Sequence, residues 1–175
     1  MKNATLKVAA VAVLCASAGA MAANNPTAAG LNSVGDLNIS ITKGELVRVS
    51  QLADILFPPM ATMAADTTLT TDICVFSTTG GYNVTVTSPN ANVNQLRLAA
   101  GGNFLPYSMS LDDYAAPQTL PHGIQRTGFT GADPVNDLCS GGTNATLSAT
   151  ILSADFNAVP AGAYADTVTM TFNPE

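Results

Sequence analysis

Residues 144–151 read NATLSATI, a stretch in which polar and apolar side chains alternate at every position. The same period of two recurs in residues 37–42 (LNISIT), 82–87 (YNVTVT) and 167–172 (TVTMTF). Successive side chains of a β-strand point to opposite faces, so one face of each stretch is apolar and the other carries Thr, Ser or Asn. This pattern is typical of half-buried antiparallel strands, and it predicts an all-β protein.

Turn signals separate these stretches. Gly80-Gly81 and Gly101-Gly102 suit tight turns with positive φ, and Pro-containing segments mark further loops. The segment 114–137 is rich in Pro and Gly, and we expect it to be a long excursion between strands. The segment 58–66 is compatible with either a helix or a loop. Many short strands with regular turns predict a β-sandwich.

The N-terminus has the three parts of an export signal. Lys2 and Lys7 precede an uncharged apolar run over residues 8–19, and Ala20-Met21-Ala22 supplies the small-x-small cleavage pattern. We therefore expect residues 1–22 to be a signal peptide, cut between Ala22 and Ala23. The apolar run is too short for a comfortable membrane span, so stable membrane insertion is not expected. The sequence predicts a protein that is exported through the periplasm, to the cell surface or the medium.

The predicted mature chain is small and acidic. Removing 22 of the 175 residues leaves 153, a length that suits one domain with its own core. Four basic residues then face 12 acidic ones, which lowers the net charge from −6 to −8. Such a chain lacks the basic footprint of a phosphate-binding surface, so nucleic acid is not expected to be a partner.

The mature chain has two cysteines, Cys74 and Cys139. An even count in an oxidising compartment predicts one disulfide. The alternative is a metal-binding or catalytic thiol pair, which the absence of a CxxC spacing or an adjacent histidine disfavours.

Candidate catalytic groups are few. His122 is the single histidine and is expected to be a solvated loop residue. Asp112 and Asp113 are adjacent, so on a strand they would point to opposite faces, and a polar turn is the favoured interpretation over a calcium site. With no phosphate loop, nucleophile elbow or paired carboxylates, we expect neither enzymatic activity, nor a cofactor, nor a metal.

The stretch 161–174, AGAYADTVTMTFNP, carries the most specific resemblance. It is similar to the closing strand of the spore coat protein U family, which holds pilus subunits of the archaic chaperone–usher branch and closes on AGxYxDxVxxTxxP. The stretches 72–74 and 81–86, and 105–110, resemble two further strands of that family. Family members often have a cysteine in the first body strand, where this chain has residues 46–50, so its disulfide is expected to join different strands.

The resemblance implies an incomplete immunoglobulin-like sandwich that lacks its final strand. It divides the chain into the signal peptide (1–22), an N-terminal extension (23–43) and the sandwich domain (44–175). A periplasmic chaperone would first fill the open groove. At an outer-membrane usher, the extension of the next subunit would then replace it by β-strand addition. The groove would be bordered by the C-terminal strand through Tyr164, Val168, Met170 and Phe172.

The expected donor strand within the extension presents Leu37, Ile39 and Ile41 on one face, with Gly35 on the same face. The resemblance thus implies a pilus subunit that polymerises by donor-strand exchange and supports adhesion or biofilm formation. Three alternatives remain. The segment could be the first strand of its own sandwich, or the chain could be a non-polymerising secreted sandwich that binds carbohydrate or another surface. It could also be a tip adhesin, although a second, receptor-binding domain has no room in this length.

Overall fold

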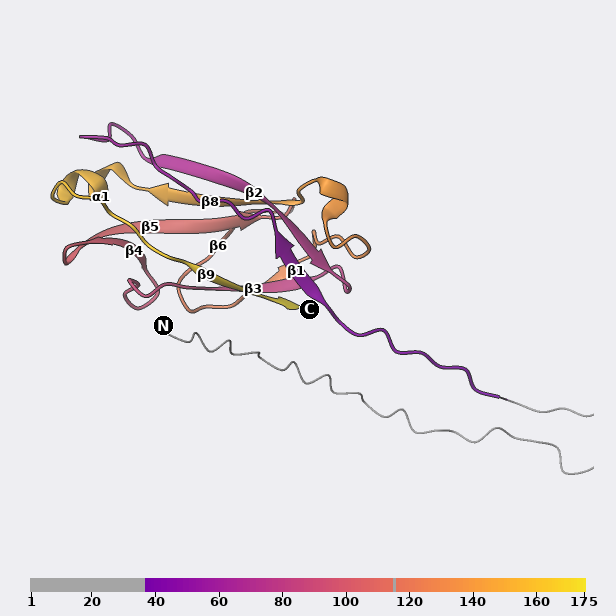
Figure 1. Ribbon diagram of the computed structural model, residues 1–175. Coiled ribbons are helices and arrows are strands. Elements are labelled where there is room, and N and C mark those ends of the chain that lie inside the picture. Colours follow the sequence, from indigo (N-terminus) through magenta and orange to yellow (C-terminus); the bar gives the residue numbers. More distant parts are fainter. Residues whose placement is uncertain (1–36, 115) are drawn as a thin grey trace, which may run out of the picture. The chain divides into compact units, whose positions relative to one another are not determined.

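The computed structural model describes residues 37–114 and 116–175, of which Gly44–Glu175 form one compact unit (Figure 1). The predicted signal peptide, its cleavage between Ala22 and Ala23, and Gly35 lie outside the described residues. Leu37–Lys43 belongs to a separate unit, where the backbone is extended without strand pairing and all seven side chains are exposed. None of the helices in the described ranges has the length and apolar character that a bilayer span requires.

The compact unit is almost entirely β-structure. Its elements follow one another as β1 (Val47–Ser50), β2 (Thr67–Ser77), β3 (Tyr82–Thr87), β4 (Leu96–Ala100), β5 (Asn103–Asp112), β6 (Gln118–Thr119), β7 (Arg126–Phe129), the 3₁₀ turn η1 (Cys139–Gly141), β8 (Ala145–Ile151), α1 (Ser153–Ala158) and β9 (Thr169–Pro174). The predicted all-β class is confirmed.

The strands form two antiparallel sheets. The larger sheet has the order β1-β2-β8-β5-β4, with β6 added to β5, and the smaller has the order β7-β3-β9. The period of two holds within them: β8 buries Ala145, Leu147, Ala149 and Ile151, while the Thr and Ser between them stay partly exposed. In β3, Tyr82, Val84 and Val86 are fully buried. The inner faces of the two sheets therefore build one sandwich core, as the alternation predicted.

Aromatic side chains from all three strands of the smaller sheet contact one another. The Tyr82 ring stacks on Phe129 of β7 with centroids 5.1 Å apart and lies 5.9 Å from the Phe172 ring of β9. Three strands thus meet in one buried cluster. Gly101 and Gly102, both at positive φ, make the turn between β4 and β5, as expected.

The structure corrects the expectation for residues 114–137. This segment is not a bare excursion, because it contains β6, which pairs with β5, and β7, which pairs with β3. The segment packs against the body because Leu120 and Phe129 are buried in the core. These strands have two and four residues, too few for a period of two to be visible in the sequence.

The segment left open, 58–66, has no helix. It is held instead by α1, where the Asn157 side-chain amide donates to the Met63 carbonyl (2.9 Å) and its oxygen accepts from the Met63 amide (3.0 Å). Met63 is buried beneath this contact.

Candidate functional site

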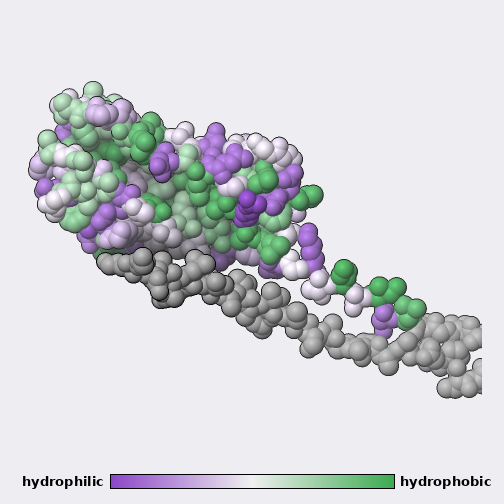
Figure 2. Space-filling model, viewed as in Figure 1, coloured by the Kyte–Doolittle hydropathy of each residue, from purple (hydrophilic) through white to green (hydrophobic). Residues whose placement is uncertain are grey.

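A groove of about 390 Å³ opens between β9 and the chain that follows β1. Its lining residues come from three places: Leu52–Ile55 and Phe57 on one side, Leu98, Tyr107, Met109, Leu147 and Ala149 from the larger sheet, and Asp166–Val168 with Met170 on the other side. The sheet residues are inward-facing positions of β4, β5 and β8, so core side chains form the floor of the groove, and Tyr107, Met109, Leu147 and Ala149 are 4–8% exposed there. Figure 2, viewed as in Figure 1, shows hydrophobic residues interspersed with hydrophilic ones on the visible face of the body.

One wall of the groove is formed by Asp166–Val168 and by Met170 near the start of β9, a strand with one sheet partner among the described residues. Within the described residues β9 pairs with β3 only, from Tyr82↔Pro174 to Thr87↔Thr169. Its apolar side chains Met170 and Phe172 are half-buried, whereas Thr169 and Thr171 are exposed. An edge strand with a free side and an apolar face next to an open groove is a template for a further strand.

The opposite wall is a segment that pairs with no strand among residues 37–114 and 116–175. β1 ends at Ser50, where its pairing with β2 also ends. The next residue, Gln51, has a φ of 63°, and its side-chain amide donates to the Gly142 carbonyl (2.8 Å). Beyond it, Ile55 and Phe57 are half-buried and pack against the core, while Leu56 between them is 78% exposed. The alternation shows that this wall also presents an apolar face to the groove.

Asp166 closes one end of the groove with a hydrogen-bond network. Its carboxylate accepts from the Tyr107 hydroxyl (2.7 Å), the Ser88 hydroxyl (2.8 Å) and the Asn90 side-chain amide (2.9 Å). It also accepts from the Thr167 backbone amide (2.9 Å). No ion pair to Asp166 occurs within the described part of the chain, where Arg48–Asp137 is the one salt bridge. A half-buried negative charge without a cationic partner therefore lies at this end.

Two tyrosines of the core have raised pKa values. Burial is the main cause of the raised pKa of Tyr107, and its hydrogen bond to Asp166 and the charge of that carboxylate add to it. For Tyr82, burial again comes first and the negative charge of Asp113 second, so its pKa is raised as well. In both, the folded protein favours the neutral phenol.

These shifts predict alkaline destabilisation. Because the pKa of each tyrosine is higher in the folded than in the unfolded chain, its contribution to stability is complete below the ordinary pKa of 10.0 and is lost as the pH rises above it. Urea unfolding between about pH 8 and about pH 12 should show a free energy that falls with a steepening slope above about pH 10. Tyr107→Phe should make that slope shallower, and an unchanged slope in this variant would contradict the assignment to Tyr107.

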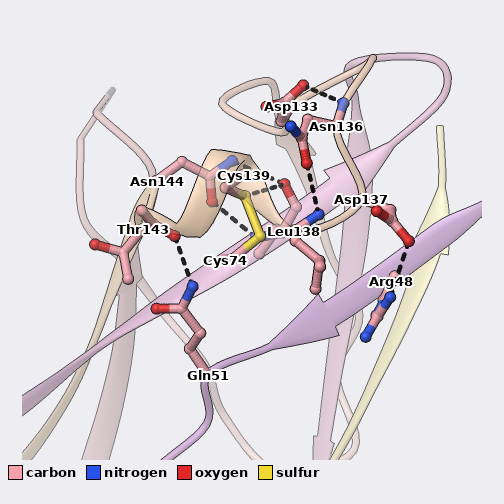
Figure 3. Close-up of a disulfide and its surroundings, with 12 residues drawn as sticks. Arg48, Gln51, Cys74, Asp133, Asn136, Asp137, Leu138, Cys139, Thr143 and Asn144 are labelled. Carbon is pink, nitrogen blue, oxygen red and sulfur yellow. Dashed lines mark hydrogen bonds and ion pairs between the residues drawn. A yellow bond between two sulfur atoms is a disulfide. The ribbon is translucent and has the colours of Figure 1, made fainter.

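The disulfide joins the two sequence-predicted cysteines. Cys74 of β2 is bonded to Cys139 of η1, with Cα atoms 5.9 Å apart and a sequence separation of 65. Figure 3 shows η1 lying over β2 and the ion pair from Arg48 of β1 to Asp137 (2.9 Å) beside it. The bond anchors the loop between β7 and β8, and neither cysteine is among the residues that line the groove.

The structure brings some predicted site residues together. Val168 and Met170 line the groove, and Phe172 packs against the core beside Tyr82. Tyr164 packs on the core, and its hydroxyl donates to the Pro160 carbonyl (2.9 Å).

The predicted donor residues lie in the separate extended unit. Leu37, Ile39 and Ile41 are 69%, 90% and 96% exposed, so three aliphatic side chains on one face have no packing partner among the described residues. The wall 52–57 and the Tyr107–Asp166 contact were not found from the sequence. The signal for the wall was the sparse alternation of Ile55 and Phe57. Asp166 occupies the Asp position of the quoted motif AGxYxDxVxxTxxP, but nothing in the sequence indicated that Tyr107 contacts it.

The structure corrects one expectation for a polar residue and refines another. His122 is not a solvated loop residue: it is half-buried, and its Nδ1 accepts from the Ser88 amide (3.1 Å). The chain bends after Asp112, whose carboxylate accepts from the Tyr114 amide (3.1 Å), as expected for a polar turn, but Asp113 is 3% exposed and accepts from the Thr130 (2.8 Å) and Gly131 (2.9 Å) amides. The side chains of His122 and Asp113 both satisfy backbone donors in loops. Among the described residues, no group of three or more His, Cys, Asp or Glu could hold a metal ion.

Comparison with known proteins adds a structural likeness. No family model and no curated protein matches the sequence. The fold is similar to a chain of a solved structure, described as a chaperone–tip adhesin complex that is vital for synergistic activation of CFA/I fimbriae biogenesis, with a TM-score of 0.51 and 14% identity. The match covers 74% of this chain and 41% of that chain, so this chain spans about two fifths of its neighbour's length. At this identity the likeness shows the fold alone, a β-sandwich that also occurs in a fimbrial assembly complex.

Proposed function

We propose that this chain is a structural subunit of a chaperone–usher surface pilus, and that it polymerises by donor-strand exchange. The observation that carries the proposal is the largely apolar groove beside Asp166–Val168 and Met170, where the chain enters the edge strand β9. The same chain has a segment with three exposed aliphatic side chains, those of Leu37, Ile39 and Ile41. The segment of one copy can add as a strand to the groove of the next copy, which gives the segment a sheet and the groove a strand.

The energetics favour such an exchange. Each aliphatic side chain that moves from water into the groove contributes roughly 1.5–3 kcal/mol. The segment of residues 37–43, which we call the arm, would also gain a ladder of main-chain hydrogen bonds with β9. Without an occupant, the exposed groove and free edge are an aggregation hazard. A periplasmic chaperone that fills the groove with its own strand, followed by exchange at an outer-membrane usher, resolves that hazard. The likeness to a chain from a complex of fimbriae biogenesis supports this scheme.

On this proposal the protein is exported and lies at the cell surface, where it supports adhesion or biofilm formation and has no catalytic role. The test is electron microscopy of surface material sheared from cells that make the protein, with an antibody raised against the body (44–175). Label at regular intervals along filaments is the expected result. Label confined to filament ends indicates a tip or initiating role, and filaments without label, or soluble protein only, contradict the proposal.

A further inference from the structure

The arm carries one charge, Lys43, next to its apolar side chains, and the groove is lined by two carboxylates, Asp54 on one wall and Asp166 on the other. Lys43 follows Ile41 at the same spacing of two that separates Leu37, Ile39 and Ile41, and it is the single lysine after the predicted signal peptide. Asp166 precedes Val168 at the same spacing of two that separates Val168, Met170 and Phe172. From residue 166 to residue 174, half-buried and exposed side chains alternate without a break, so Asp166 shares the groove-facing side of this segment.

We infer that Lys43 of one copy pairs with Asp166 of the next, and that this ion pair sets the direction and register of the arm in the groove. The inference rests on the proposed polymerisation. In an antiparallel pair, directly opposite residues share a face and their numbers have a constant sum. Placing Lys43 opposite Asp166 then places Ile41 opposite Val168, Ile39 opposite Met170 and Leu37 opposite Phe172. This single register therefore places each of the three aliphatic side chains of the arm opposite an apolar side chain, and the Lys43 ammonium group opposite the Asp166 carboxylate.

Neighbouring registers that keep the apolar face inward are worse. A shift of two residues one way places the Lys43 ammonium group against Val168, and a shift the other way places Ile41 against the Asp166 carboxylate. Either shift buries a charge against an apolar side chain, which is costly. Side-chain alternation alone would tolerate both shifts, because each preserves the faces. The charge pair thus distinguishes the correct register from registers shifted by two residues, which the aliphatic side chains alone cannot do.

The reversed, parallel direction makes a different prediction. It places Lys43 at the far end of β9, beside Pro174 and Glu175, and leaves Asp166 with no cation. Glu175 is already engaged, since its carboxylate accepts from the Gly128 amide (2.8 Å). The two directions therefore differ in which carboxylate lies within reach of Lys43.

A zero-length carbodiimide cross-link reports that carboxylate directly. The reagent joins an amine to a carboxyl group only when the two are in contact, and Lys43 provides the one side-chain amine of the predicted mature chain. Filaments of the full-length mature protein would be treated, digested with chymotrypsin and analysed by mass spectrometry. We expect a Lys43–Asp166 link that joins two copies, which isotope-mixed filaments identify. A dominant link to Glu175, or to Asp54 on the opposite wall, overturns the inference.

Charge variants of the arm give an independent readout that leaves the body unchanged. Lys43→Glu should lower the yield of filaments at least about fivefold, whereas Lys43→Arg should keep it within about twofold of the wild type. Thr42→Glu is the matched control, because its side chain is on the opposite face of the arm, and it should assemble normally. Equal losses in Lys43→Glu and Thr42→Glu would overturn the inference.

A charge exchange completes the test. Asp166→Lys combined with Lys43→Glu should restore assembly relative to Lys43→Glu alone if the body remains folded. Because Asp166 also holds Tyr107, Ser88 and Asn90, the folding of Asp166→Lys is checked first, and the cross-link decides the inference if that variant misfolds. Failure of the wild type to form filaments refutes the proposed function itself. Filaments that form without the Lys43–Asp166 link refute only the register.

Discussion

Ile39→Asp is expected to abolish polymerisation while leaving the body folded. Ile39 is 90% exposed in the described chain, so the substitution removes no contact from the compact unit Gly44–Glu175. In a filament, the side chain would lose about 1.5–3 kcal/mol of apolar burial, and a carboxylate would enter an apolar groove at a cost of several kcal/mol more. Since 1.4 kcal/mol corresponds to a factor of ten, the affinity of the arm should fall at least about a thousandfold.

The measurement compares filament yield in sheared surface material with the amount and the unfolding curve of the purified monomer. Ser40→Asp is the matched control, because it introduces the same charge one residue away on the polar face of the arm. It should assemble normally. An Ile39→Asp monomer that fails to fold would instead favour the alternative that this segment is the first strand of its own sandwich.

Replacing both Cys74 and Cys139 with Ala should lower the free energy of unfolding by about 4 kcal/mol. The bond closes a loop with a sequence separation of 65, and the chain-entropy treatment of cross-links assigns that loop about 4 kcal/mol. Domains of this size have a net stability of about 5–15 kcal/mol, so the loss is a large share of the total. Urea unfolding of the oxidised protein and the double variant measures the difference.

Loop contacts can be separated from the cross-link with a second variant. Arg48→Ala removes the ion pair that holds the same loop to β1, but both partners are about half exposed, with side-chain exposures of 50% and 58%. Such surface pairs contribute about 0–1 kcal/mol, so this variant should stay close to the wild type. A double cysteine variant that loses less than about 1 kcal/mol would show that the cross-link stabilises little.

Local patterns predicted much of the fold. Residues 82–87 and 144–151 alternate cleanly because one side of each strand is buried, and both became strands with the predicted inner residues. The predicted closing strand, 167–172, is shifted in the structure to Thr169–Pro174, because pairing with β3 begins at Thr87↔Thr169. β2 was harder to predict, since Ile73, Cys74 and Val75 are all buried and interrupt the period of two.

The buried polar residues could not be predicted from neighbouring residues. Asp113 lies in the core because two amides of the distant loop at Thr130 and Gly131 need an acceptor. His122 is held in the same way by Ser88. In each case the partner lies 17 or more residues away, and only the folded chain brings the two together.

The sequence by itself determined the β-class, the expected export signal, the cysteine pairing and the alternating aliphatic side chains of the arm. Each depends on composition, on a local motif or on a period of two between near neighbours. Only the tertiary structure decided that the space beside β9 is a groove, that Leu52–Ile55 and Phe57 form its second wall, and that Tyr107 holds Asp166 at its end. These features join residues from β4, β5, β8 and the flanks of β1 and β9. Whether an apolar side chain is buried or left uncovered depends on which strands pack together, and that is a property of the whole sandwich.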